Sequence, residues 1–250
     1  MDPLYDSLRT NASFVGLCRQ LRLPLQPPAA MHPGQNVTPE EAAAGLTLEE
    51  KAAGFRLLFD GRTLEGWRSD DTNWRVVDGA ISMVSTGRLH PSPLRHVGRT
   101  VPDNFELRFE WRIPPQGRGG VNYRPGLVQY QVIDNALVPA AERWHSRAGS
   151  LMACIGHSYE DSSRRPGQWN TARIVCQGTT IEHWLNEKKQ FRYDYTHRGL
   201  TNLLAALDRE EFRRIKTTFG NVRARGGYLS LQDEGVPGTA YRRLRWRVLE

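Results

Sequence analysis

The sequence predicts an antiparallel β-sandwich of the jelly-roll type from about residue 54 to the C-terminus. Residues 105–113 alternate strictly between apolar and charged side chains, as a strand with one buried face does. Many further short segments of this kind are separated by turn signals, which is typical of sandwiches and jelly rolls. The chain has 250 residues, of which 39% are hydrophobic, so it can bury a large core without disulfide or metal support.

The elements follow in order along the chain. Residues 1–53 form an N-terminal extension in which the proline-rich segment 24–34 interrupts regular structure. Two capping boxes, Thr38–Glu41 and Thr47–Glu50, predict short helices. Asp78-Gly79 favours a type I′ turn within a hairpin over 74–84. The other predicted strands cover 56–61, 105–113, 120–124, 128–134, 150–155, 171–176, 180–186, 228–232 and 241–248, and one or two helical turns are expected within 201–217.

Composition and charge exclude several classes of protein. The 34 basic and 27 acidic residues give a net charge of +7, but no block of like charges or basic stripe with interleaved aromatics appears, so we expect no nucleic-acid partner. No apolar run is long enough for a membrane span, and residues 12–18 make a poor signal-peptide core. The three cysteines match no metal-binding spacing; a pairing of Cys154 with Cys176 and two buried thiols both remain open.

Strand alternation places an unusual set of polar residues on the faces opposite the predicted core. If these strands share a sheet, their carboxylates, amides, guanidinium groups and imidazole form a surface suited to a polyhydroxylated ligand. The alternative is that each is an ordinary solvated strand residue. The set is Glu106, Glu110, Arg112, Asn122, Arg124, Gln129, Gln131, His183, Gln232 and Glu234. Outside it, Trp169-Asn170 fits a ligand platform or a core tryptophan with a turn asparagine, and His145 lies in a loop.

Several segments together resemble the 3-keto-disaccharide hydrolase domain, formerly the domain of unknown function 1080. The resemblance covers about residues 48–250 and rests on 54–67, 105–112, 120–124, 130–134, 169–174, 183–186 and 231–233. It implies a concanavalin-like jelly roll acting on 3-keto-glycosides, usually in exported or periplasmic bacterial proteins, although no clear signal peptide is present. The chain departs from the family pattern at Arg118-Gly119 for Asn-Ser, Gln129 for Glu, and Glu234 for His.

The resemblance implies a reaction and a set of candidate residues. A ketone at C3 acidifies the C2 proton, so a base can remove it and expel the C1 substituent before water adds back. The candidates are His183 or His145 as base and Glu110 and Glu234 as acid/base groups or metal ligands. Substrate-binding candidates are Arg124, Gln129, Gln131, Trp169, Asn170 and Gln232. We expect no organic cofactor; with Glu234 in place of a histidine, a hard cation such as Ca²⁺ or Mn²⁺ is favoured if a metal is used.

Two functions therefore remain open. The enzyme hypothesis expects a small carbohydrate substrate and predicts that Glu110, Arg124, Gln131, His183 and Glu234 converge on one concave face. The alternative is a non-catalytic carbohydrate-binding β-sandwich module, because fold alone does not imply function. The oligomeric state and the glycoside are not set by the sequence.

Overall fold

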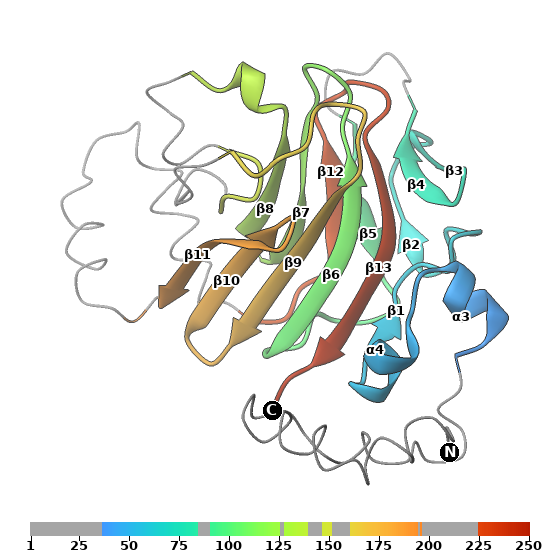
Figure 1. Ribbon diagram of the computed structural model, residues 1–250. Helices are drawn as coiled ribbons and strands as arrows, with labels where there is room; N and C mark the ends of the chain where they lie inside the picture. Colours follow the sequence, from blue (N-terminus) through green and yellow to red (C-terminus); the bar gives the residue numbers. More distant parts are fainter. Residues whose placement is uncertain are drawn as a thin grey trace, which may run out of the picture. The chain divides into compact units, whose positions relative to one another are not determined.

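The computed structural model describes residues 37–84, 91–125, 128–139, 147–151, 161–194, 196 and 225–250. Residues 37–250 make one compact unit, in which two antiparallel sheets pack face to face (Figure 1). The fold prediction is thereby confirmed. The helical turns expected within 201–217, the loop that carries His145 and most of the strand expected at 150–155 lie outside the described residues. Among the described helices, none is long and apolar enough to cross a membrane.

The larger sheet, here called sheet A, is drawn in front in Figure 1 and has eight strands. Its order is β11-β10-β9-β6-β13-β4-β3. Strand β4 pairs with the beginning of β13, and β1 pairs with the later part of β13, at Arg245 and Trp246. The bounds are β1 Arg56–Leu57, β3 Trp74–Val77, β4 Ala80–Met83, β6 Phe105–Arg112, β9 Asn170–Gln177, β10 Thr180–Leu185, β11 Lys188–Asp194 and β13 Ala240–Val248. The predicted hairpin over 74–84 is confirmed, with Asp78 at φ 50° and Gly79 at φ 72°.

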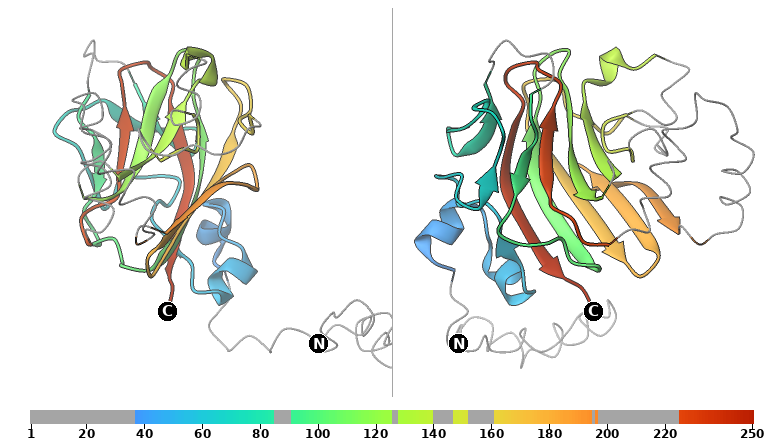
Figure 2. Two further views of the ribbon diagram at one scale, coloured as in Figure 1. Left: turned by 90° about the vertical axis from the view of Figure 1, so that its left-hand side faces the viewer. Right: turned by 180° about the vertical axis from the view of Figure 1, so that it is seen from behind.

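The second sheet, sheet B, has the strand order β2-β5-β12-β7-β8 and lies behind sheet A in Figure 1; Figure 2 shows it from the rear. Its strands are β2 Trp67–Arg68, β5 Leu94–His96, β7 Arg118–Arg124, β8 Val128–Ile133 and β12 Ser230–Asp233. Strands β2, β5 and β11 are not among the predicted strands. The first two have only two or three residues, which is too short for an alternating pattern to be recognised.

The core lies between the two sheets and follows the alternation of each strand. In β6 the apolar residues from Phe105 to Trp111 are almost fully buried, and β7 and β8 bury Val121, Tyr123 and Tyr130 against them. The intervening residues of β6 face away from sheet B. Every described strand of sheets A and B therefore has an inner face in the core and an outer face, and the two outer faces point in opposite directions.

The two predicted helices precede the sandwich and belong to the same compact unit. Helices α3 (Pro39–Ala43) and α4 (Leu48–Ala52) both begin with a complete capping box. In α4 the glutamate of that box, Glu50, also accepts hydrogen bonds from Arg245 and Arg108 on the outer face of sheet A. This capping residue therefore attaches the helix to the sheet. A 3₁₀ turn, η1 (Asn135–Leu137), follows β8.

Candidate active site on the outer face of sheet B

The predicted site residues do not share one face, and that prediction was wrong. Glu110 lies on the outer face of sheet A, whereas Gln131 and Gln232 lie on the outer face of sheet B. His183 lies between the sheets with no exposed surface. Alternation shows which residues of one strand share a face. The assignment of each strand to sheet A or sheet B decides which of these residues lie near one another.

His183 was assigned to the wrong side of its strand. It alternates in phase with Ile181 and Leu185, both buried, so the same parity places it in the core. Its Nδ1 atom donates to the carbonyl oxygen of Gly149 at 3.0 Å, and Nε2 therefore accepts the hydroxyl proton of Tyr123 at 2.8 Å. Burial lowers the pKa of His183 to about 3. A neutral imidazole held by two partners and closed off from solvent cannot reach a sugar in this arrangement.

Three of the predicted binding residues, Gln129, Gln131 and Gln232, are brought together on the outer face of sheet B. The Gln129 amide donates to Oε1 of Gln232 at 2.9 Å, and the Asn122 amide donates to the same oxygen at 3.3 Å. Asn122 also donates to the hydroxyl of Ser230 at 3.1 Å. Gln131 lies on the same side of β8 as Gln129. These contacts fix three planar amides side by side on neighbouring strands β8, β7 and β12. Arg124 was predicted to join them, but a bulge in β7 pairs it with the core residue Val128, and its guanidinium donates to the Asp103 carbonyl.

The amide cluster borders a pocket of about 370 Å³. Its lining comprises Pro93, Arg95, Asn122, Arg124, Pro125, Tyr228, Ser230 and Gln232. The Oδ1 atom of Asn122 is buried and has no hydrogen-bond partner among the described residues. Leaving a buried acceptor unsatisfied costs about 1–3 kcal/mol, so a donor from a bound molecule would be stabilised there. Tyr228 is 54% exposed at the same pocket and offers an aromatic face of the kind on which sugars stack.

A glycine and a serine set the positions of the two glutamines of β8. A Cβ added at Gly120 would lie 2.3 Å from the side chain of Gln129, so only glycine lets this amide lie across β7 toward Gln232. Gln131 accepts a hydrogen bond from the Ser150 hydroxyl at 2.9 Å, and its backbone pairs with the Gly149–Ser150 segment. Because His183 holds the Gly149 carbonyl from inside the core, it supports the position of Gln131.

Glu234 follows β12 and continues its ladder with β7, since its N–H donates to the carbonyl oxygen of Arg118. Alternation places it on the same side as Gln232, two residues away, and its side chain is exposed. The next turn is fixed by Asp233, whose carboxylate accepts the Gly235 N–H at 2.7 Å. Burial raises the pKa of Asp233. Ser230 and Gln232 share the outer side of β12; Tyr228 precedes this strand by two residues, and Glu234 follows its last residue.

Three other predicted residues lie elsewhere. Glu110 is paired with Arg242 at 2.7 Å and Arg243 at 2.9 Å on the outer face of sheet A. Trp169 belongs to the same side of the molecule, with the Arg242 guanidinium 4.0 Å from its ring centre. Asn170 is buried, and its Oδ1 accepts hydrogen bonds from the Arg164 N–H and the Asn186 amide, which is the turn role that the sequence left open. His145 lies outside the described residues.

The described residues do not fit the Ca²⁺ or Mn²⁺ site that the sequence suggested. They contain no cluster of three or more histidine, cysteine, aspartate or glutamate side chains able to hold a metal. Glu110 and Glu234 lie at the outer faces of different sheets and cannot share an ion. Hard cations of this kind bind several oxygen ligands, usually with more than one carboxylate. No step of the proposed reaction is therefore routed through a metal.

Comparison with known proteins assigns the family. Residues 54–247 match the model of the 3-keto-alpha-glucoside-1,2-lyase-like domain. The chain belongs to this family. It is 24% identical over 242 residues to the 3-keto-disaccharide hydrolase of Bacteroides thetaiotaomicron, an alignment that covers 82% of each chain.

Solved structures support the fold. A candidate glycosyl hydrolase from Parabacteroides distasonis superposes with a TM-score of 0.66 at 24% identity, covering 82% of this chain and 98% of that one. A second from the same organism gives 0.58 at 20% identity, covering 78% and 99%. Both comparisons agree with the two-sheet architecture described above.

Sequence reasoning found the glutamines of the site but not its whole lining. Asn122 had been placed on the polar side of its strand, yet its unpaired oxygen is visible only in three dimensions. Ser230 and Tyr228 lie within the strand predicted at 228–232, which gave no sign of a role in the site. An available signal was the parity of β12, since positions 228, 230, 232 and 234 are all aromatic or polar.

Proposed function

We propose that this protein cleaves the C1–O bond of 3-keto-glycosides on the outer face of sheet B. The observation that carries the proposal is the unpaired Asn122 oxygen in a pocket beside two fixed glutamine amides. Such amides give a sugar paired donors and acceptors, and the family match supports a carbohydrate ligand. The segment from residue 228 to residue 234, which contains β12, spans about 20 Å when extended, at roughly 3.3 Å per residue. This length accommodates more than one sugar ring.

The keto group determines the chemistry. With a carbonyl at C3, the electron pair left on C2 after proton removal is delocalised onto the C3 oxygen as an enediolate. The C1–O bond then breaks, the leaving oxygen takes a proton, and a C1–C2 double bond forms. Water adds back across this double bond, with hydroxyl at C1 and a proton at C2. This route needs one group able to accept and return a proton, and not the two spaced carboxylates of an ordinary glycosidase.

Among the described residues, we assign that role to Glu234. It is an exposed carboxylate on the same side of β12 as Gln232, so it can take the C2 proton and return it to the leaving oxygen. Arg124 lines the pocket, but its buried guanidinium donates to the Asp103 carbonyl, so we assign it no part in proton transfer. Asn122, Gln129 and Gln232 hold the sugar hydroxyls, and Tyr228 stacks against a ring.

The second candidate function is sugar binding without cleavage. It is favoured by Gln129, which stands where the family pattern has a glutamate and which donates a hydrogen bond to Gln232 that a carboxylate could not donate. The pocket is the same in both cases, so turnover must be measured separately from binding.

The test is proton NMR of a 3-keto-glucoside and its unoxidised counterpart, incubated with purified protein. We expect cleavage of the keto compound only. Glu234→Gln should lower kcat by about 10²–10⁴-fold, the usual contribution of a general base. Glu65→Gln, which removes an exposed carboxylate that does not line the pocket, should leave kcat unchanged. Binding without turnover would identify the module, and equal turnover of both compounds would exclude the keto-dependent route.

A further inference from the structure

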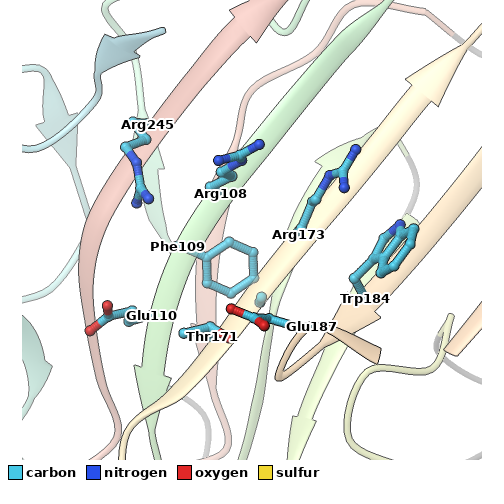
Figure 3. Close-up of a pocket in the computed structure, with 9 residues that line it drawn as sticks. Arg108, Phe109, Glu110, Thr171, Arg173, Trp184, Glu187 and Arg245 are labelled. Carbon is cyan, nitrogen blue, oxygen red and sulfur yellow. The ribbon is translucent and has the colours of Figure 1, made fainter. Parts of the chain in front are cut away.

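The outer face of sheet A carries a row of cationic side chains directly opposite one another on neighbouring strands. Arg245 of β13 pairs in register with Arg108 of β6, and Arg108 pairs with Arg173 of β9. Trp184 of β10 continues the row next to Arg173, and Lys189 of β11 follows it. Figure 3 shows the three arginines and the tryptophan along one edge of a groove. At roughly 4.8 Å between strands, five strands make a row about 19 Å long.

Such a row is unfavourable for stability by itself. Like charges directly opposite each other in a sheet destabilise the pairing. The neighbouring carboxylates compensate only in part. Glu50, Glu106 and Glu110 form ion pairs with six arginines, and Glu182 pairs with Lys189 and Arg192. With Glu187 of the groove counted as well, these eight cations face five carboxylates, which leaves a surplus of three positive charges. The Trp184 ring lies between Arg173 and Lys189, about 5 Å from each cation, and attracts both without neutralising their charge. The surplus creates an attractive potential for anions at this face.

Arg173 is the side chain of the row with the most unused donors. Its Nε atom lies 2.8 Å from Oε1 of Glu106, but the N–H is not directed at that oxygen, so the contact is ionic without a hydrogen bond. Its side chain is 37% exposed. By contrast, Arg245 donates twice to Glu50 and is 15% exposed. A guanidinium with free, planar donors binds a carboxylate or sulfate through two parallel hydrogen bonds.

The opposite wall of the groove has a different chemistry. The groove has a volume of about 310 Å³, and Glu110, Thr171 and Glu187 lie across from the arginine row (Figure 3). Carboxylates and a hydroxyl accept hydrogen bonds from the hydroxyl groups of a sugar. One wall therefore suits an anion, and the other suits a polyol.

We propose that this groove binds an acidic oligosaccharide, with its carboxylate or sulfate group on Arg173 and Arg108 and its hydroxyls toward Glu110, Thr171 and Glu187. The groove lies on the opposite side of the sandwich from the pocket on sheet B, so it is a second site and does not depend on the reaction proposed there. It would hold a charged part of a polymer, or a separate acidic chain, away from the site of cleavage.

The test is isothermal titration calorimetry with three probes: trigalacturonate, a sulfated galactose disaccharide and neutral maltotriose. We expect one or both acidic probes to bind, with affinity falling as salt rises from 50 to 200 mM, and no binding of maltotriose at this groove. Preference between the acidic probes identifies the anionic group. Arg173→Gln should weaken binding by about 10- to 100-fold, the value of one charge-assisted pair.

Two matched variants make the result decisive. Arg75→Gln removes the same charge from the exposed edge strand β3 of sheet A and should leave the affinity unchanged. Gln232→Ala disrupts the sheet B pocket and should also leave the affinity for the acidic probe unchanged. Loss of the reaction on sheet B can therefore be distinguished from loss of binding at the sheet A groove. Unaltered binding in Arg173→Gln, with the melting temperature of each variant as a folding control, would overturn the proposal. Equal loss in Gln232→Ala would do the same.

Discussion

His183 offers the sharpest test of the structure, because the sequence made it one of two candidate bases, with His145, and the fold makes it a core residue. We consider His183→Gln, which keeps a donor and an acceptor for Gly149 and Tyr123 without a group that titrates near neutral pH. If His183 acts only inside the core, the variant should retain kcat at pH 7 within a few-fold, provided that it folds.

The magnitude follows from proton linkage. The pKa of His183 is lowered to about 3 by burial, against about 6.5 for an exposed histidine, so the unfolded chain binds a proton at a pH where the folded chain does not. Above about pH 6.5 His183 is neutral in both the folded and the unfolded chain, and its protonation does not reduce the free energy of unfolding. As the pH falls from about 6.5 toward 3, the unfolded chain is protonated first, so the free energy of unfolding decreases progressively. Between pH 7 and pH 5 the folded state should lose about 2 kcal/mol through this one residue.

The assay is urea unfolding of both proteins at pH 7 and pH 5. The wild-type protein should lose about 2 kcal/mol more than His183→Gln over this interval, since all other titrating groups are shared. Two results would refute the reasoning: the same pH dependence in both proteins, or a kcat lowered 10²–10⁴-fold in a variant that remains folded. The second result would restore His183 as a base.

Three further predictions concern the same described residues. Glu106→Gln should destabilise the fold by about 3–5 kcal/mol in urea unfolding, because Glu106 is 1% exposed and compensates Arg108, Arg173 and Arg247; a loss below 1 kcal/mol would contradict this. Gly120→Ala should displace the Gln129 amide and raise KM for the 3-keto substrate about tenfold with little change in Tm, and an unchanged KM would show that this amide does not bind substrate. Burial raises the pKa of the Cys176 thiol to about 11, so iodoacetamide at pH 8 should label it only after unfolding, as peptide mass spectrometry can show; rapid labelling of the folded protein would disprove its burial.

The two outer faces differ in how their polar residues are held. On sheet A the carboxylates are neutralised by arginines, and the same guanidinium groups leave a positive surplus. On sheet B the strand residues facing outward are amides, hydroxyls and arginines, with Glu234 following β12. Glu110 is engaged by two guanidinium groups, whereas Glu234 forms no ion pair with any of the described residues.

The sequence by itself determined the local structure of this protein. The strict alternation of residues 105–113, the Asp78-Gly79 turn and the two capping boxes each depend on contacts between near neighbours, and the structure confirms all of them. The family pattern was also readable from short motifs, and the match over residues 54–247 confirms it. Only the tertiary structure decided which polar faces meet. Glu110 and Gln131 both alternate outward, but their strands join different sheets, and His183 shares the parity of Ile181. The alternation of side chains with a period of two shows which residues of one strand share a face. Pairing between strands far apart in the sequence, such as that of Asn122 with Ser230, decides which of these residues come together in a site.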